Sequence, residues 1–143
     1  MVDADLKGYF DTIPKDRLLT LVKEHISDSR LLKLIKLFLD QNIMEDLREW
    51  TPIAGVPQGA VLSPVLSNLY LNPLDHAMSD NGFEMVRYAD DFVVLCRSEF
   101  EAEVALQLIT EWLEAAGLTL HPTKTKIVDS RAESFAFLGY SFR

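Results

Sequence analysis

Three aspartates with apolar neighbours are the residues of this 143-residue sequence best suited to chemistry. Asp5 stands between Ala4 and Leu6, and Asp90-Asp91 divides two runs rich in valine and aromatic residues. Carboxylates held together and partly desolvated repel one another, so they take up protons unless a cation intervenes. A pair of Mg²⁺ ions suits such a site, because Mg²⁺ favours oxygen ligands and keeps positions open for phosphate oxygens. The chemistry implied is in-line phosphoryl transfer.

Each aspartate also has a simpler explanation when it is taken singly. Adjacent aspartates between two β runs are typical of a solvated turn, because aspartate tolerates turn geometry. Asp5 alone would be a strand-end residue that reaches water. Only the joint pattern favours a site, and it requires the two places to meet in space.

The elements that must bring them together are predicted from hydrophobic spacing and from capping residues. Residues 2–6 are expected to form a strand and residues 83–95 a hairpin that is broken at 89–91. Four helices are expected, which begin near Pro14, after Asp28, at Ser63-Pro64 (ending at Pro73) and at Phe100 (ending at Gly117). A loop or small hairpin is expected at 43–54, and short strands are expected at 118–120, 127–128 and 135–142.

This order predicts an α+β fold, a ferredoxin-like split βαβ layout whose antiparallel sheet is covered by helices on one face. In such a sheet the first strand pairs beside the hairpin. Asp5 and the Asp90-Asp91 turn would then meet at one edge of the open face. The phosphoryl-transfer hypothesis depends on this adjacency.

Composition narrows the class of protein. Fourteen Lys+Arg against 22 Asp+Glu give a net charge of −8, so we expect this chain to bind nucleic acid weakly without help. The lone Cys96 excludes a disulfide scaffold or a zinc ribbon. The N-terminus does not resemble a signal peptide, and no run approaches the roughly 18 apolar residues of a membrane span. We expect one cytoplasmic domain over residues 1–143.

Five motifs extend this interpretation, because together they resemble the reverse transcriptase family, most closely its group II intron reverse transcriptase/maturase type. Their order in the sequence is that of the family, and they cover residues 2–142. The motifs are Asp5-Leu6-Lys7-Gly8-Tyr9-Phe10-Asp11, Gly55-Val56-Pro57-Gln58-Gly59 with Leu62-Ser63-Pro64, Tyr88-Ala89-Asp90-Asp91, Gly117-Leu118 through Lys124-Thr125, and Phe137-Leu138-Gly139-Tyr140.

The resemblance implies a polymerase palm and a role for each matching residue. Asp5, Asp90 and Asp91, with the Leu6 carbonyl, would hold two Mg²⁺ ions, for which Mn²⁺ could substitute. Phe10 would exclude the 2′-hydroxyl of the nucleotide, because a packed ring offers an added oxygen no room and no hydrogen bond. The remaining roles are Gln58 in the nucleotide and template pocket, Lys124 near the triphosphate, and Leu138, Gly139 and Tyr140, with Phe137, at the primer terminus.

Simpler alternatives remain for five of these residues: a core aromatic for Phe10, a plain loop for Gln58, a solvated lysine for Lys124, and core closure for Phe137 and Tyr140. The implied partners are an RNA template, a DNA primer and a dNTP. We expect fingers and thumb to be absent, so that the chain alone is weakly active or inactive and could form a homodimer through exposed palm surface. The rival function from a different class is a non-catalytic RNA-binding maturase remnant that assists intron splicing. A second rival is a nucleotidyl cyclase or another palm-fold polymerase, against which the Pro57-Gln58-Gly59 context speaks.

Overall fold

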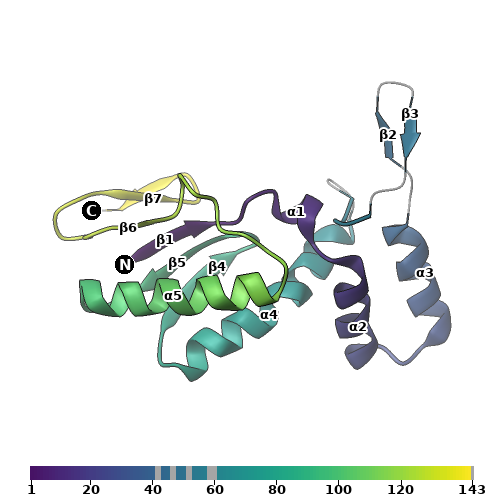
Figure 1. Ribbon diagram of the computed structural model, residues 1–143, viewed down its shortest axis with the longest axis horizontal. Coiled ribbons are helices and arrows are strands. Elements are labelled where there is room, and N and C mark those ends of the chain that lie inside the picture. The colour runs from purple at the N-terminus through teal and green to yellow at the C-terminus, as the bar shows by residue number, and fades with distance from the viewer. Residues whose placement is uncertain (41–42, 46–47, 51–52, 58–60, 143) are drawn as a thin grey trace. The chain divides into compact units, whose positions relative to one another are not determined.

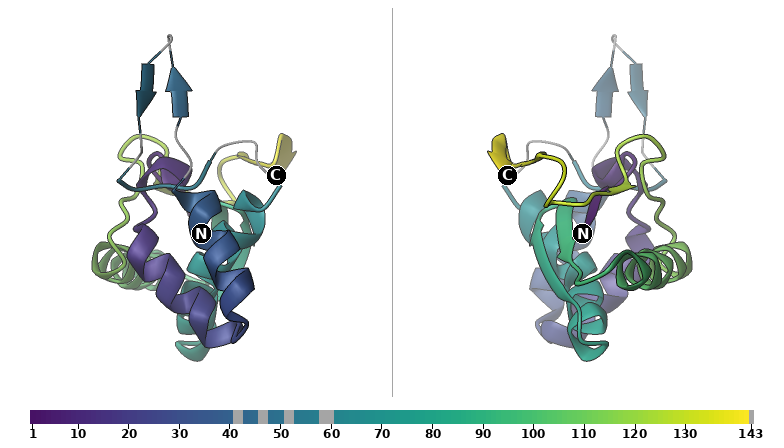
Figure 2. Two further views of the ribbon diagram at one scale, coloured as in Figure 1. Left: turned by 90° about the vertical axis from the view of Figure 1, so that its right-hand side faces the viewer. Right: turned by 90° about the vertical axis from the view of Figure 1, so that its left-hand side faces the viewer.

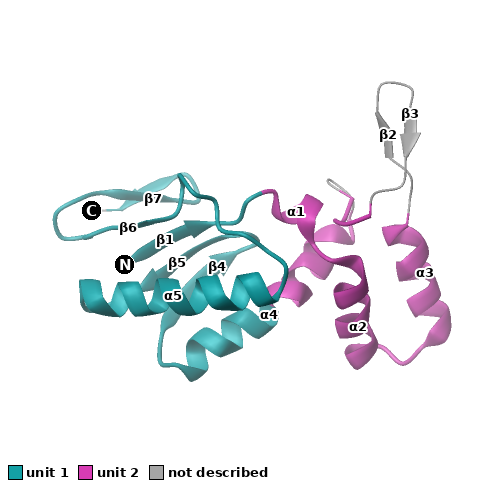
Figure 3. Ribbon diagram, in the orientation of Figure 1, with its two compact units in different colours: residues 1–7, 72–143 teal, residues 8–71 magenta. Residues whose placement is uncertain are grey.

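The computed structural model describes residues 1–40, 43–45, 48–50, 53–57 and 61–142. The chain forms two compact units: Met1–Lys7 with Asn72–Arg143, and Gly8–Leu71 (Figure 3). The first unit contains the main sheet, and the second unit is mainly helical (Figure 1). In the described part of the chain, no helix combines the length and the apolar character needed to cross a membrane.

The main sheet has four antiparallel strands in the order β4-β5-β1-β6 (Figures 1 and 2). The first strand therefore lies between the hairpin and the late strand β6, as the split βαβ prediction requires. The α+β fold class is confirmed. The bounds are β1 (Val2–Asp5), β4 (Glu84–Tyr88), β5 (Asp91–Leu95) and β6 (Lys126–Ile127).

One face of this sheet is the core of the first unit. Val2 and Ala4 alternate with aspartates along β1 and are buried, and Phe92 and Val94, their partners on β5, are buried with them. Side chains two apart in a strand share a face, so these four form one apolar surface. Helix α5 (Glu99–Ala115) packs against β1, β5 and β6. It ends as predicted: Gly117 has φ 76°, and the Gly117 and Leu118 amides donate to the carbonyls of Glu114 and Leu113.

The opposite face is covered only in part. Strands β7 (Phe135–Phe137) and β8 (Tyr140–Phe142) form a separate hairpin, and Phe137 packs with Met1, Val93 and Val128. Val93 lies on the sheet face away from Phe92, so this small cluster covers one end of that face. The aspartates of β1 lie on the same face.

The second unit contains α1 (Tyr9–Thr12), α2 (Lys15–His25), α3 (Ser29–Leu39) and the first residues of α4 (Ser63–Asp80). Asp28 caps α3 as its position predicts, because its carboxylate accepts from the Arg30 and Leu31 amides at 2.7 and 3.2 Å. The hairpin expected within 43–54 is present as β2 (Ile43–Glu45) paired with β3 (Arg48–Trp50).

Three details of the prediction were wrong. Helix α4 does not end at Pro73 but continues to Asp80. A proline inside a helix costs about 3 kcal/mol, whereas full burial of Leu74 and of Met78 contributes roughly 1.5–3 kcal/mol each, which outweighs it. Ser63 is predicted to be the N-cap of this helix, with Pro64 as its first residue, but it is itself the first residue of α4, and its hydroxyl donates to the Pro57 carbonyl. Residues 118–120 form only a single bridge, between Leu120 and Leu6.

Candidate active site

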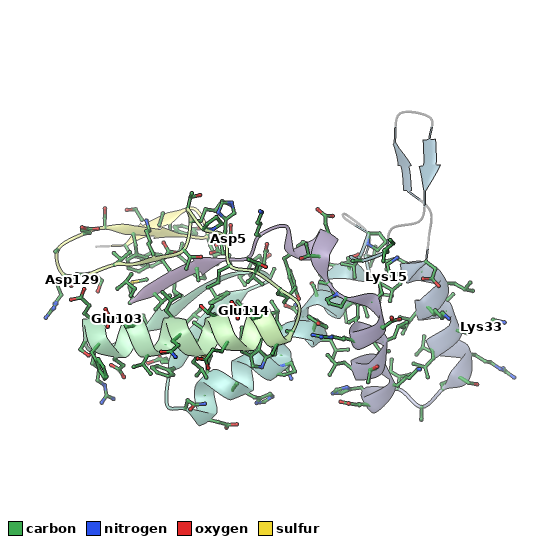
Figure 4. All side chains as sticks on the ribbon, in the orientation of Figure 1. Asp5, Lys15, Lys33, Glu103, Glu114 and Asp129 are labelled. Carbon is green, nitrogen blue, oxygen red and sulfur yellow. The ribbon has the colours of Figure 1, made fainter. Side chains whose placement is uncertain are left out.

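Asp5 and Asp91 face each other across two neighbouring strands. Asp5 is the last residue of β1 and Asp91 the first of β5, and the antiparallel register pairs them directly. Paired residues of this kind have Cβ atoms about 4.5–5.5 Å apart, on the same face of the sheet. Figure 4 labels Asp5 on the face away from α5. The predicted adjacency of Asp5 and the Asp90-Asp91 segment is therefore present.

The turn beside this pair is two residues long and strained. Tyr88 pairs with Asp91, so Ala89 and Asp90 form the loop between β4 and β5. Ala89 has φ 54°, in the left-handed region that glycine tolerates and that costs other residues of order 1–3 kcal/mol. Such strain persists only where neighbouring structure holds it in place. The loop therefore presents Asp90 beside Asp91 in one imposed conformation.

Lys124 places a cation against one of these carboxylates, Asp5. Its ammonium Nζ lies 2.6 Å from Asp5 Oδ2, although the lysine side chain itself is 63% exposed. The hydrogen bond and the negative charge of Asp5 raise the pKa of Lys124. Backbone bonds hold the segment close, because the His121 amide donates to the Asp5 carbonyl at 2.8 Å and the Thr125 amide to the His121 carbonyl at 3.1 Å.

A fourth carboxylate, Asp3, which belongs to none of the five motifs, shares this face. Asp3 lies two residues before Asp5 on β1, and its Oδ2 is 3.7 Å from Lys126 Nζ. Asp3 could have been identified from the sequence, because side chains two residues apart on a strand lie on the same face of the sheet. Asp3, Asp5, Asp91, Thr123, Lys124 and Lys126 line a pocket of about 440 Å³.

Burial disfavours the charged forms of Asp3 and Asp91, which line this pocket, and of Asp90 in the adjoining turn. Burial raises the pKa of Asp91, and the neighbouring charges of Asp3, Asp5 and Asp90 raise it further. Burial also raises the pKa of Asp90, and Asp5 adds to the effect. The pKa of Asp3 is raised by burial, against the opposing charge of Lys126. The site therefore has more negative charge than its lysines neutralise.

The donor chemistry of the pocket suits a hard cation. Carboxylate and carbonyl oxygens are the ligands that Mg²⁺ prefers, and uncompensated carboxylates are stabilised by a divalent ion. Among the residues that the structure describes, however, no three His, Cys, Asp or Glu side chains form a group that could hold a metal ion as they stand. At Asp5 the Lys124 ammonium serves as the counter-ion.

The other predicted nucleotide-binding residues are less completely placed. Leu6 is buried and forms the bridge to Leu120. Phe10 belongs to α1 in the second unit, where its carbonyl accepts the Val56 amide at 2.7 Å and its ring lies 5.5 Å from that of Tyr9. Gln58 lies outside the described residues. The proposed roles of these three residues stay predictions.

The predicted primer-grip segment forms the β7–β8 turn. Leu138 and Gly139 both have positive φ values, 51° and 79°, as a two-residue type I′ turn requires. Phe137 is 9% exposed and belongs to the core cluster, whereas Tyr140 is 73% exposed. Core closure therefore accounts for Phe137, and it does not account for Tyr140.

Comparison with known proteins identifies the family. The sequence profile described as "Reverse transcriptase (RNA-dependent DNA polymerase)" matches residues 1–142. The chain belongs to the reverse transcriptase family. This match confirms the family resemblance that the five motifs indicated.

Relatives of this reverse transcriptase-family chain include intron-encoded proteins. It is 27% identical to the uncharacterized 91 kDa protein in cob intron of Schizosaccharomyces pombe, over 96% of this chain and 24% of the relative. It is 39% identical to the group II intron-encoded protein LtrA of Lactococcus lactis subsp. cremoris, over 52% of this chain and 12% of the relative. The chain thus spans about a quarter or less of these relatives. A solved partial Cas6-RT-Cas1–Cas2 complex is similar over 79% of this chain and 21% of that chain, with 30% identity and a TM-score of 0.45.

Proposed function

We propose that this chain carries the nucleotidyl-transfer centre of an RNA-directed DNA polymerase. The observation that carries the proposal is the pairing of Asp5 with Asp91 beside the strained Ala89-Asp90 turn, in a chain of the reverse transcriptase family. In this reaction the primer 3′-oxygen forms a bond to the α-phosphorus of a dNTP. The bond from that phosphorus to the bridging oxygen breaks, pyrophosphate leaves, and the hydroxyl proton is lost.

The carboxylates would hold the divalent cations that reverse transcriptases generally use. Asp5, Asp90 and Asp91, with the Leu6 carbonyl, are the proposed ligands of two Mg²⁺ ions, with Mn²⁺ as a substitute. Bound there, such ions would lower the cost of deprotonating a hydroxyl and of releasing a negatively charged oxygen. The chain's contribution is to keep these acidic groups together despite their repulsion, through the β1–β5 pairing and the imposed turn.

Lys124 would act on the phosphate side of the reaction. Like any lysine it carries a proton and a positive charge at neutral pH, and the contact with Asp5 raises its pKa further. An ammonium held beside Asp5 can neutralise a triphosphate oxygen or donate a proton to the departing pyrophosphate. This role separates Lys124 from a merely solvated lysine, and it depends on the 2.6 Å contact with Asp5.

The proposed partners are an RNA template, a DNA primer and a dNTP. Phe10 would select the sugar, Gln58 would line the nucleotide pocket, and Leu138, Gly139 and Tyr140 would contact the primer end. The names of the relatives support a group II intron type of mobile element as the source. A homodimer and a cytoplasmic location stay predictions.

Primer extension tests the proposal in the protein translated from the complete open reading frame that encodes residues 1–143. We expect Mg²⁺-dependent extension of a DNA primer on an RNA template, reduced at least a hundredfold in Asp5→Asn and Asp90→Asn. The matched control is Asp80→Asn, at the exposed end of α4. Equal extension by Asp90→Asn and the parent protein would exclude the carboxylate role.

The same protein distinguishes the rival function. An RNA-binding maturase remnant would bind structured RNA with equal affinity in the parent protein, Asp5→Asn and Asp90→Asn, and would extend no primer in any of them. A polymerase would keep RNA binding in both variants and lose only synthesis. Filter binding and primer extension on one preparation separate these results.

A further inference from the structure

The Arg87 guanidinium connects the strained turn to a helix. Its Nε and Nη2 donate to Asp75 Oδ1 and Oδ2 of α4 at 2.7 and 2.5 Å, a two-point contact that fixes the plane of the guanidinium. Its Nη1 donates to the Ala89 carbonyl at 2.9 Å. One side chain therefore joins the helix carboxylate to the first residue of the loop that carries Asp90.

The position of Arg87 in the strand makes this arrangement unusual. Arg87 pairs with the buried Phe92, so it lies on the helix-covered face of the sheet, and its side chain is only 10% exposed. Burying a guanidinium is costly unless the charge is paired and the donors are used. The Asp75 carboxylate pairs with the charge of Arg87, and the Ala89 carbonyl accepts a hydrogen bond from a further N–H group of the guanidinium. A simple apolar residue would fill this strand position at lower cost.

The Ala89-Asp90 turn needs a contact from another part of the chain to keep its strained conformation. Ala89 has a left-handed φ that an alanine avoids in a free loop. Its carbonyl receives the Arg87 donor, so the hydrogen bond acts on the strained residue itself. Asp90 follows Ala89 directly, and Asp91 closes the loop opposite Tyr88. Whatever fixes Ala89 also sets the direction in which these two carboxylates leave the backbone.

We propose that Arg87, held by Asp75, is a positioning residue that clamps the Ala89-Asp90 turn and so orients Asp90 and Asp91. The catalytic meaning of this clamp rests on the proposed function, but the clamp itself is a property of the fold. If Arg87 clamps the turn, the turn should loosen when the two-point contact with Asp75 is lost, even though the sheet and α5 stay intact.

Hydrogen exchange of the backbone amides tests the clamp without any activity. In Arg87→Lys the charge remains, but one ammonium cannot make both the two-point contact and the bond to Ala89. We expect amides 89–91 to exchange at least several-fold faster than in the parent chain, with α5 unchanged. Arg131→Lys is the matched control, because Arg131 also pairs with an aspartate, Asp129 at 3.1 Å, but on the surface.

Two further variants separate positioning from general stability. The double change Asp75→Leu with Arg87→Leu removes both charges, so no uncompensated charge is left buried. It should fold, with α5 protected, and should still show fast exchange at 89–91. Adding Ala89→Gly to Arg87→Lys should restore slow exchange, because glycine adopts the left-handed φ without strain.

Primer extension then tests the consequence for the reaction. Arg87→Lys should lower kcat about tenfold, since a small misplacement of reacting groups is costly, with KM for dNTP within about twofold. Ala89→Gly should recover part of that loss. Unchanged exchange at 89–91, equal loosening of α5, or no rescue by Ala89→Gly would overturn the clamp. A parent protein that extends no primer would refute the proposed function and leave the exchange result standing.

Discussion

Asp5 and Asp91 form a directly opposed pair of like charges where the two central strands of an antiparallel sheet, β1 and β5, end their pairing. Like charges in such a pair destabilise the sheet, and here Asp3 and Asp90 add to the repulsion. Folding therefore concentrates negative charge at a cost in stability. The same arrangement is what a site for cations and phosphates requires, so stability and the proposed function make opposite demands on these residues.

Removal of one carboxylate should consequently stabilise the chain at neutral pH. The pKa of Asp91 is raised in the fold from its ordinary value of 3.8, so the folded state binds protons more tightly than the unfolded state. The contribution of Asp91 is most favourable below that value and is lost as the pH rises through the raised pKa. We expect Asp91→Asn to melt about 2 °C higher at pH 7 in EDTA, a small change because solvent screens a part-exposed group.

At about pH 3 the two proteins should melt together, because the carboxyl is then protonated in both states. Asp80→Asn, measured alongside, should show no such pH-dependent gain. A lower melting temperature of Asp91→Asn at pH 7 would contradict the repulsion that the geometry implies.

Lys124 should compete with added cations for Asp5. Its ammonium occupies Asp5 Oδ2 at 2.6 Å, so a divalent ion must exchange with it there. We expect Lys124→Ala to bind Mn²⁺ a few-fold more tightly than the parent chain, as measured by electron paramagnetic resonance of free Mn²⁺. Lys23→Ala, a change in α2, is the control for the loss of one positive charge. Weaker binding in Lys124→Ala would show that the lysine supports the cation instead of replacing it.

Gly55 should tolerate a side chain less well than Gly8, the other described glycine of the second unit. It has φ 92°, and a Cβ there would lie 2.7 Å from the Phe10 carbonyl oxygen and 2.9 Å from Asp11 Cα. The Gly55 and Val56 amides donate to the Ile13 and Phe10 carbonyls, so the backbone has no room to retreat. We expect Gly55→Ala to lower the free energy of unfolding by about 3 kcal/mol in urea titrations.

Gly82→Ala is the matched control for that effect. Gly82 also has a left-handed φ, 79°, but a Cβ there would meet nothing within 4 Å. It should cost only the conformational strain, about 1–2 kcal/mol. Equal losses in the two variants would mean that the close approach to Phe10 contributes nothing.

The sheet was predictable because its signals are local and periodic. The alternation of Val2 and Ala4 with aspartates and the break at 89–91 determine which residues face the core, and chain order then places the first strand beside the hairpin. Pro73 misled the prediction because its local preference opposes the burial of Leu74 and Met78, which only the folded chain reveals.

Contacts between polar side chains that are far apart in the sequence could not be predicted from residue spacing or motifs. Nothing in the spacing of Asp75 and Arg87 indicates a two-point contact, because a helix and a strand bring them together. The contact of Lys124 with Asp5 likewise joins residues 119 positions apart. The motif resemblance pointed to Lys124, but not to its partner.

Phe137 and Tyr140 should separate core closure from primer contact. Phe137 packs with Met1, Val93 and Val128, so Phe137→Ala should lower the free energy of unfolding by about 3 kcal/mol. Tyr140 is 73% exposed, so Tyr140→Ala should change the free energy of unfolding by less than about 0.5 kcal/mol.

If the Tyr140 ring stacks on the primer end, as the proposed function implies, Tyr140→Ala should still weaken primer–template binding about tenfold, since one base–aromatic stack is worth about 1–3 kcal/mol. Fluorescence anisotropy of a labelled primer–template, on the protein from the complete reading frame, measures this directly. Unchanged affinity in Tyr140→Ala would remove the tyrosine from the primer contact and leave β7–β8 as a lid over the apolar end of the sheet.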